Sequence, residues 1–286
     1  MSLLVRYAAP DGTAAVGVLT DGVVRELPDA TLDEMLALTL DDLRQLVLTA
    51  ASSDAIDVQD VTLLAPVETQ EVWAAGVTYL RSRDARLEES GGLDVYAQVY
   101  VSDRPELFFK SNGWRVAGPD QPVGVRPDSQ WNVPEPELAV VVNAHGEIVG
   151  YTLGNDMSSR DIEGANPLYL PQAKIYDGAC ALGPGIRPAW DLPGAPTFDL
   201  TLEVTRDGST VTKGAVSTSS MARSFDDLVR WLRVAMTFPV GAVLLTGTGI
   251  VPDAAVSVQP GDAVTITGEH IGMLRNPVQA AGAGRH

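Results

Sequence analysis

The chain has 286 residues, 45% of them hydrophobic and 20% charged, which is typical of a folded protein with one large core or two unequal domains. A formal net charge of −17 at pH 7 argues against nucleic acid as a partner, because phosphate binding needs clustered lysines and arginines. No apolar stretch reaches membrane-spanning length, the first residues lack a signal-peptide pattern, and there is one cysteine. We therefore expect a cytoplasmic protein with no membrane partner.

Residues 1–65 predict a small N-terminal α+β domain. Short apolar runs separated by Pro-Asp-Gly and Asp-Gly turns predict strands at residues 3–8, 15–19 and 23–26. Apolar side chains then recur at helical spacing and predict a helix over residues 31–50. The Ala65-Pro66-Val67 segment is the expected junction to a second domain, residues 66–286.

The second domain is expected to consist mainly of short strands that alternate with glycine- and proline-rich turns. Its few expected helices lie at residues 79–90, 95–101, 160–169 and 225–237, the last preceded by a capping signal at Ser224. Many strands and few helices predict an α+β, β-rich fold, built as a roll or sandwich.

Two glutamates stand one residue apart where an apolar, β-branched run begins. Glu135-Pro-Glu137 leads into Leu-Ala-Val-Val-Val, which predicts a buried strand. Because side chains alternate faces along a strand, both carboxylates are expected on one side, roughly 6–7 Å apart at their Cα atoms. Two like charges at the mouth of a buried strand are costly unless another group compensates them.

A turn at residues 143–147 and a second apolar run at 148–153 predict a hairpin. In it, residue 135 would lie opposite about 155, and 137 opposite about 153, so Asp156 arrives beside both glutamates. Three converging carboxylates with no Cys or His in this stretch favour Mg²⁺ or Mn²⁺ and leave about half of an octahedron for substrate and water. From spacing alone, three solvated acids at a polar hairpin end fit equally well.

Six motifs follow one another in order from about residue 70 to 278. They are Gly76-Val-Thr-Tyr79, Leu107-Phe-Phe-Lys110, Glu135-Pro-Glu137-Leu-Ala-Val-Val, Gly150-Tyr-Thr-Leu-Gly-Asn-Asp156, Thr246-Gly247-Thr248-Gly249, and Gly261-Asp-Ala-Val-Thr-Ile followed by Ile271-Gly-Met-Leu-Arg-Asn-Pro-Val. Together they resemble the fumarylacetoacetate hydrolase superfamily. The resemblance implies a mixed β-sandwich roll, a homodimer or higher homo-oligomer, and a divalent metal held by Glu135, Glu137 and Asp156.

Two segments, 73–83 and 159–184, are similar to the 2-keto-3-deoxy-D-arabinonate dehydratase branch of that family. Hydrolase members carry a catalytic histidine in the loop after the Gly-x-x-Tyr motif. The corresponding place in this chain is near Ser82, and none of the three histidines lies in that loop. Glu163 also stands where many hydrolases have Gln. Both departures imply a substrate other than that of the hydrolases.

Two residues are candidates for proton transfer. Lys174 matches the family lysine and is expected as a general base beside the metal, although an ordinary surface lysine is the commoner case. Glu106, next to two phenylalanines, fits a protonated general acid and an acid at a helix end about equally well. Lys110 is expected to support a metal-ligand carboxylate rather than to touch the substrate.

Three residues are candidates for substrate binding. The resemblance places Thr248 at the substrate carboxylate and adds Glu163. Arg83 is the preferred partner for a carboxylate or for sugar hydroxyls, because it and Arg81 point about 200° apart on a helix and at most one of them faces the site. Both arginines also fit solvated helix positions.

These features predict a divalent-metal-dependent dehydratase, a hydro-lyase acting on a 2-keto-3-deoxy sugar acid such as 2-keto-3-deoxy-D-arabinonate to give a 2,5-dioxo acid. The alternative is a metal-dependent hydrolase or decarboxylase of β-diketo acids of the fumarylacetoacetate or acylpyruvate type. A third hypothesis is a non-catalytic keto-acid-binding protein.

Overall fold

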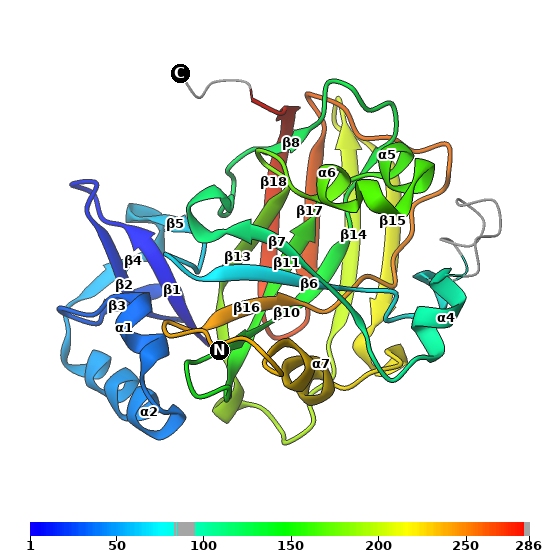
Figure 1. Ribbon diagram of the computed structural model, residues 1–286. Coiled ribbons are helices and arrows are strands. Elements are labelled where there is room, and N and C mark those ends of the chain that lie inside the picture. The colour runs from blue at the N-terminus through cyan, green and yellow to red at the C-terminus, as the bar shows by residue number, and fades with distance from the viewer. Residues whose placement is uncertain (83, 85–94, 283–286) are drawn as a thin grey trace.

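The computed structural model describes residues 1–82, 84 and 95–282 (Figure 1). The three expected N-terminal strands are present as an antiparallel meander of β1 (Ser2–Ala8), β2 (Ala14–Thr20) and β3 (Val23–Glu26). Two shorter strands, β4 (Ala55–Asp57) and β5 (Thr62–Leu64), pair with β3 and β1.

The single helix expected over residues 31–50 is two helices, α1 (Leu32–Ala37) and α2 (Leu40–Thr49). The chain is extended at Leu38 and Thr39, with ψ of 160° at both. Thr39 accepts a hydrogen bond from the amide of Asp42 and so caps α2, because a threonine hydroxyl satisfies a helix-start amide better than it supports a helix interior. Apolar periodicity continues across this break, so the sequence pattern did not indicate it.

The largest sheet has 11 strands within the described residues, in the order β4-β3-β2-β1-β13-β11-β10-β16-β6-β7, with β5 attached to β1. Beyond the N-terminal strands it contains β6 (Glu71–Gly76), β10 (Pro136–Val142), β11 (Ile148–Asp156), β13 (Cys180–Pro188) and β16 (Ala242–Leu245), with β7 (Glu106–Asn112) at its edge. Strand β1 pairs with β13, so the N-terminal strands extend the sheet of the main body. The division into two domains at residue 65 stays a prediction.

A second, five-stranded sheet packs against the first (Figure 1). Its strands run in the order β15 (Ser209–Ser217), β14 (Asp199–Arg206), β17 (Ala263–Gly268), β18 (Gly272–Ala280) and β8 (Val123–Val125). The short strands β9 (Asn132–Val133) and β12 (Ser158–Ser159) pair with each other. This arrangement confirms the β-rich fold of the fumarylacetoacetate hydrolase type.

Strand β10 lies between two hydrophobic cores. Leu138 and Val140 pack in the core shared with the second sheet, whereas Ala139 and Val141 pack in the core that contains α1. Because both faces of the strand are covered, its sequence is an uninterrupted apolar run rather than an alternating one. Glu135 and Glu137, at the start of this strand, are buried as well.

The remaining helices are α4 (Val95–Val101), α5 (Arg160–Ala165), α6 (Leu170–Lys174) and α7 (Phe225–Leu232), with 3₁₀ turns η1 (Ala50–Ser52), η2 (Val58–Asp60), η3 (Gly113–Arg115), η4 (Pro167–Tyr169), η5 (Ala189–Asp191) and η6 (Thr218–Ser220). Helix α4 agrees with the prediction. Of the helix expected at 79–90, Tyr79 instead forms an isolated β-bridge with Met221, residues 80–82 and 84 are helical, and residues 83 and 85–90 lie outside the described residues.

Two helix ends differ from the sequence prediction. The helix expected over 160–169 stops at Ala165, because the Asn166 side chain accepts from the amide of Leu168 and starts the 3₁₀ turn η4. The helix expected over 225–237 is capped by Ser224 as predicted but ends at Leu232. There the Arg233 guanidinium donates to the carbonyl of His145, 2.7 Å away in the β10–β11 turn. The apolar periodicity of the sequence does not indicate either of these contacts.

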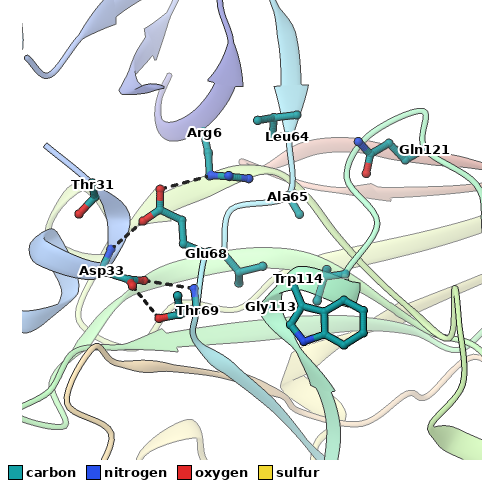
Figure 2. A pocket seen from close by; sticks show the side chains of 12 residues that line it. Arg6, Thr31, Asp33, Leu64, Ala65, Glu68, Thr69, Gly113, Trp114 and Gln121 are labelled. Atoms are coloured by element: carbon teal, nitrogen blue, oxygen red, sulfur yellow. Dashed lines mark hydrogen bonds and ion pairs between the residues drawn. The ribbon is translucent and has the colours of Figure 1, made fainter. Parts of the chain in front are cut away.

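The segment that leads from β5 into β6 is tied to the N-terminal unit by a polar cluster (Figure 2). Glu68 pairs with Arg6 at 3.4 Å and accepts from the amide of Asp33 at 3.0 Å. Asp33 in turn accepts from the amide and hydroxyl of Thr69. A cavity of about 570 Å³ lies beside this cluster, with the exposed Trp114 on its wall. The polar groups of the cluster therefore bind one another and fix α1 against the main body.

Candidate metal centre and active site

The β10–β11 hairpin brings the three predicted carboxylates together. Glu135 and Asp156 exchange both backbone hydrogen bonds, with N···O distances of 3.2 and 2.9 Å. Glu137 lies opposite Gly154. The predicted register was one residue off, because a β-bulge between Val141 and Val142 shifts the pairing. The shift places Asp156 directly across from Glu135.

The three carboxylate groups are buried and offer oxygen atoms that all lie within 4.8 Å of one another. Burial, together with the charges of Asp156 and Glu135, raises the pKa of Glu137 well above its usual range, while Lys174 and the Gly247 amide oppose this. Gly247 donates to Glu137 Oε2 at 2.6 Å. Buried anionic oxygens packed this closely fit a hard divalent cation such as Mg²⁺, which compensates their mutual repulsion.

Lys110 on β7 is buried and holds one of these carboxylates. Its ammonium donates to the carbonyls of Met157, at 3.0 Å, and Lys174, at 2.6 Å, and it forms an ion pair with Asp156. This contact agrees with the expected supporting role. An ammonium fixed by two carbonyls orients the carboxylate.

Lys174, the last residue of α6, is 2% exposed, so it is not an ordinary surface lysine. Its ammonium lies 2.6 Å from Glu135 Oε2, 3.1 Å from Asp156 Oδ2 and 2.6 Å from the hydroxyl of Ser158. A lysine that faces two metal-type ligands is positioned to exchange a proton with a molecule bound at the same oxygens.

Arg160, which no sequence pattern singled out, is also buried in this cluster. Its guanidinium forms an ion pair with Glu135, and its Nε lies 3.8 Å from Glu163. Arg160 is the first residue of α5, where the helix dipole disfavours a cation. An arginine at the start of a predicted helix was therefore a signal in the sequence that its charge pairs with another group.

Most of the predicted site residues line one cavity. Its wall includes Glu106, Glu163 and Thr248 together with the three carboxylates and Lys174. Glu106 is the first residue of β7 rather than the end of a helix. A Cβ atom on Gly76 would overlap the Glu106 carboxylate, so glycine at this position makes room for that group.

The loop that follows β16 also lines the cavity. Thr246 fixes it by donating through its amide and its hydroxyl to the carbonyl of Leu138, at 3.0 and 2.8 Å. Gly247 has φ +93°, a conformation that favours glycine. Thr248 follows, and its hydroxyl is 3.2 Å from the amide of Ile250. Thr248 therefore lines the cavity from a loop whose backbone is held by these contacts.

The other candidate residues lie at different places relative to the cavity. Arg83 lies outside the described residues. Arg81 is exposed, and Ser82, which stands near the place of the hydrolase histidine, is buried at the cavity wall. Among the described residues, His145 and His270 lie away from the cavity, in the β10–β11 turn and in the turn before β18.

Cys180 is buried on β13 directly opposite Asp156. Burial raises the pKa of its thiol to about 12, Lys110 lowers it, and Asp156 and Glu137 add to the rise. A thiol in this environment stays protonated, which agrees with an apolar filler rather than a nucleophile.

The chain belongs to the fumarylacetoacetate hydrolase family, because the family model described as fumarylacetoacetate (FAA) hydrolase C-terminal matches residues 72–279. It is 50% identical over 213 residues to the probable 2-keto-3-deoxyxylonate dehydratase of Haloferax volcanii, covering 74% of this chain and 73% of the relative. It is 39% identical over 229 residues to the 2-dehydro-3-deoxy-D-arabinonate dehydratase of Saccharolobus solfataricus, covering 79% and 77%.

A solved structure of similar fold is that of a 2-keto-3-deoxy-D-arabinonate dehydratase complexed with magnesium and 2,5-dioxopentanoate. It superimposes with a TM-score of 0.82 at 33% identity over 98% of this chain and 99% of the other. Within the described part of this chain, no helix has both the length and the apolar character needed to cross a membrane.

Proposed function

We infer that this protein is a divalent-metal-dependent dehydratase of a 2-keto-3-deoxy sugar acid. The observation that carries the inference is the buried triad of Glu135, Glu137 and Asp156 in one cavity with Lys174 and Glu106. It is supported by the names of the relatives, which are dehydratases of 2-keto-3-deoxypentonates, and by the magnesium in one of their structures. A five-carbon substrate would give 2,5-dioxopentanoate.

The metal would be held by the three carboxylates, and when bound it supplies a Lewis acid that polarises the keto group and acidifies C3. Thr248 is proposed to bind the substrate carboxylate, together with Arg83. Glu163, paired with Arg160, is proposed to face a substrate hydroxyl. These contacts would orient C3 toward Lys174 and the C4 hydroxyl toward Glu106.

Lys174 is proposed to remove a proton from C3. Its amine has to be neutral to do so, and the two oxygens that hold its ammonium belong to Glu135 and Asp156, the proposed metal ligands. The same two oxygens would also hold the divalent cation, and they would then bind the lysine proton less strongly. The Ser158 hydroxyl, 2.6 Å from Nζ, keeps the amine in place.

Glu106 is proposed to deliver a proton to the C4 hydroxyl. The C4–O bond then breaks, its electron pair leaves with water, and the electrons of the C3–H bond form the C3–C4 double bond. Migration of one hydrogen from C5 to C3, followed by transfer of the C5 hydroxyl proton to C4, completes the 2,5-dioxo acid. Glu106 is partly buried and lines the same cavity as Phe108.

The test is an assay of 2-keto-3-deoxypentonates of both C4 configurations, with Mg²⁺ and with chelator. Formation of the 2,5-dioxo acid only with metal is expected. If no epimer turns over while calorimetry shows bound Mg²⁺, the dehydratase proposal is wrong.

The hydrolase or decarboxylase alternative has less support. A carbon–carbon hydrolase needs a base that activates water, and Ser82 stands near the place of the family histidine on the cavity wall. A panel of acylpyruvates and β-diketo acids tests this alternative directly. Tight metal-dependent binding of keto acids without turnover would instead support the non-catalytic hypothesis. A homodimer or higher homo-oligomer is proposed from the family resemblance and is tested by light scattering. A cytoplasmic location is proposed from the single cysteine.

A further inference from the structure

A second, larger cavity shares two lining residues with the cavity at the acid cluster. The inner cavity leaves about 20 Å³ open, whereas the outer chamber beside it measures about 450 Å³. Glu106 and Glu163 line both of them. The carboxyl group proposed to protonate the C4 hydroxyl therefore stands at the boundary between the two spaces.

The walls of the outer chamber are mainly apolar. Val99 comes from α4, Leu107 from β7, and Pro167 and Leu170 from the η4–α6 segment. Arg104 also lines the chamber, but its guanidinium stacks 4.6 Å from the ring centre of Trp231, which holds its charge against α7. Ser102 lines the chamber too, but its hydroxyl donates to the carbonyl of Gln98, so the space beyond the two glutamates offers mostly carbon surface.

The positions of the reacting atoms decide which part of a substrate enters the chamber. With the keto acid end at the triad and the C4 hydroxyl at Glu106, a five-carbon acid extends beyond that boundary only by C5 and its hydroxyl. That group is not much larger than a water molecule, which occupies about 30 Å³ in the liquid. A chamber of about 450 Å³ has room for a longer chain.

We propose that the outer chamber is a substrate subsite that favours six-carbon acids with a terminal methyl group, the 2-keto-3,6-dideoxyhexonates. The proposal rests on the proposed dehydratase function. Val99 and Leu170 are the specificity-determining residues, because their side chains offer the apolar surface that the methyl group would cover. The atoms balance as for five carbons: C3 loses a proton, water leaves from C4, and hydrogen migration from C5 yields 2,5-dioxohexanoate without an oxidant.

The first experiment compares kcat/KM for the six-carbon acid and for the five-carbon acid of the same C4 configuration. We expect the six-carbon acid to be favoured about fourfold or more, the effect of burying one extra methyl-sized group. Val99→Phe fills the chamber and should lower kcat/KM for the six-carbon acid at least tenfold, while the five-carbon acid changes less than about threefold. Val101→Phe is the matched control, because Val101 lies on the same helix and is 77% exposed. It should leave both values unchanged.

The outcomes separate the subsite from the proposed function. If wild-type protein turns over the five-carbon acid but prefers it to the six-carbon acid, the subsite is refuted and the dehydratase stands. If Val99→Phe slows both acids equally, the chamber is an access route and the proposal is wrong.

If neither acid turns over, calorimetry with Mg²⁺ and two unreactive acids, 2-oxopentanoate and 2-oxohexanoate, decides the question. Tighter binding of the longer acid that is lost in Val99→Phe supports the subsite. Equal affinities overturn it.

Discussion

The ammonium of Lys174 lies 2.6 Å from Oε2 of Glu135, so the proposed base and a proposed metal ligand share one buried contact. Glu135 also forms an ion pair with Arg160 through its other oxygen. A buried carboxylate held between two cations has a fixed orientation. Glu137, by contrast, receives its hydrogen bond from the Gly247 amide. A substitution of Glu135 would therefore disturb the contacts with Lys174 and Arg160, whereas a substitution of Glu137 would disturb the contact with the Gly247 amide.

Glu137→Gln is for this reason the cleanest test of the metal site. It removes one anionic ligand, keeps the side-chain shape, and leaves the carboxylates that hold Lys174 unchanged. We expect Mg²⁺ affinity to fall by about an order of magnitude or more and activity to fall with it. Glu135→Gln and Asp156→Asn should weaken metal binding similarly. Calorimetry measures the affinities.

The matched control is Glu269→Gln, because Glu269 is exposed and does not line the cavity. Its Mg²⁺ affinity should equal that of the wild type. Unchanged affinity in all three ligand variants would refute the site.

Lys174→Met should abolish turnover without lowering Mg²⁺ affinity. The substitution removes the amine that is proposed to take the C3 proton, and it also removes a cation that shares two oxygens with the metal. The informative measurement is exchange of the C3 hydrogens with deuterated solvent, followed by NMR. Lys174→Arg is the companion variant, because it keeps the positive charge but does not release its proton near neutral pH. Exchange at the wild-type rate in both variants would show that another residue is the base.

Glu106→Gln should separate the two proton transfers. An amide cannot deliver a proton to the C4 hydroxyl, so product formation should fall roughly a hundredfold or more while C3 exchange continues. Exchange by NMR and product formation by a coupled assay are measured on the same sample. Loss of both together would assign Glu106 to positioning instead, and an unaffected rate would remove it from the mechanism. In a carbon–carbon hydrolase the base acts on water, and the substitution has no reason to uncouple the two.

Cys180 should be unreactive in the folded protein. It is 1% exposed, and burial raises the pKa of its thiol to about 12, so almost no thiolate is present at pH 8. Titration with a disulfide reagent should detect no thiol under native conditions and one per chain in denaturant. A fast native reaction would show that β13 opens beside Asp156. Saturating Mg²⁺ should slow any native reaction further, because a ligand that binds only the folded state suppresses opening.

The sequence alone determined the carboxylate triad, the buried strand that carries two of its members, and the β-rich class. The Glu-x-Glu spacing fixes a common face through the two-residue period of a strand, and an apolar run covered on both faces has no alternation. Local turn chemistry also placed the hairpin at residues 143–147, which lies between β10 and β11 in the structure.

The tertiary structure decided the rest, because the deciding contacts join residues far apart in the chain. The bulge at Val141 shifted the register by one residue and set Asp156 across from Glu135. The burial of Lys174 and Arg160 follows from packing of α5 and α6 over that hairpin end, and no local periodicity encodes it. The breaks at Thr39 and Asn166 depend on side-chain caps that compete with helix continuation. The outer chamber exists only where α4, β7 and α6 meet.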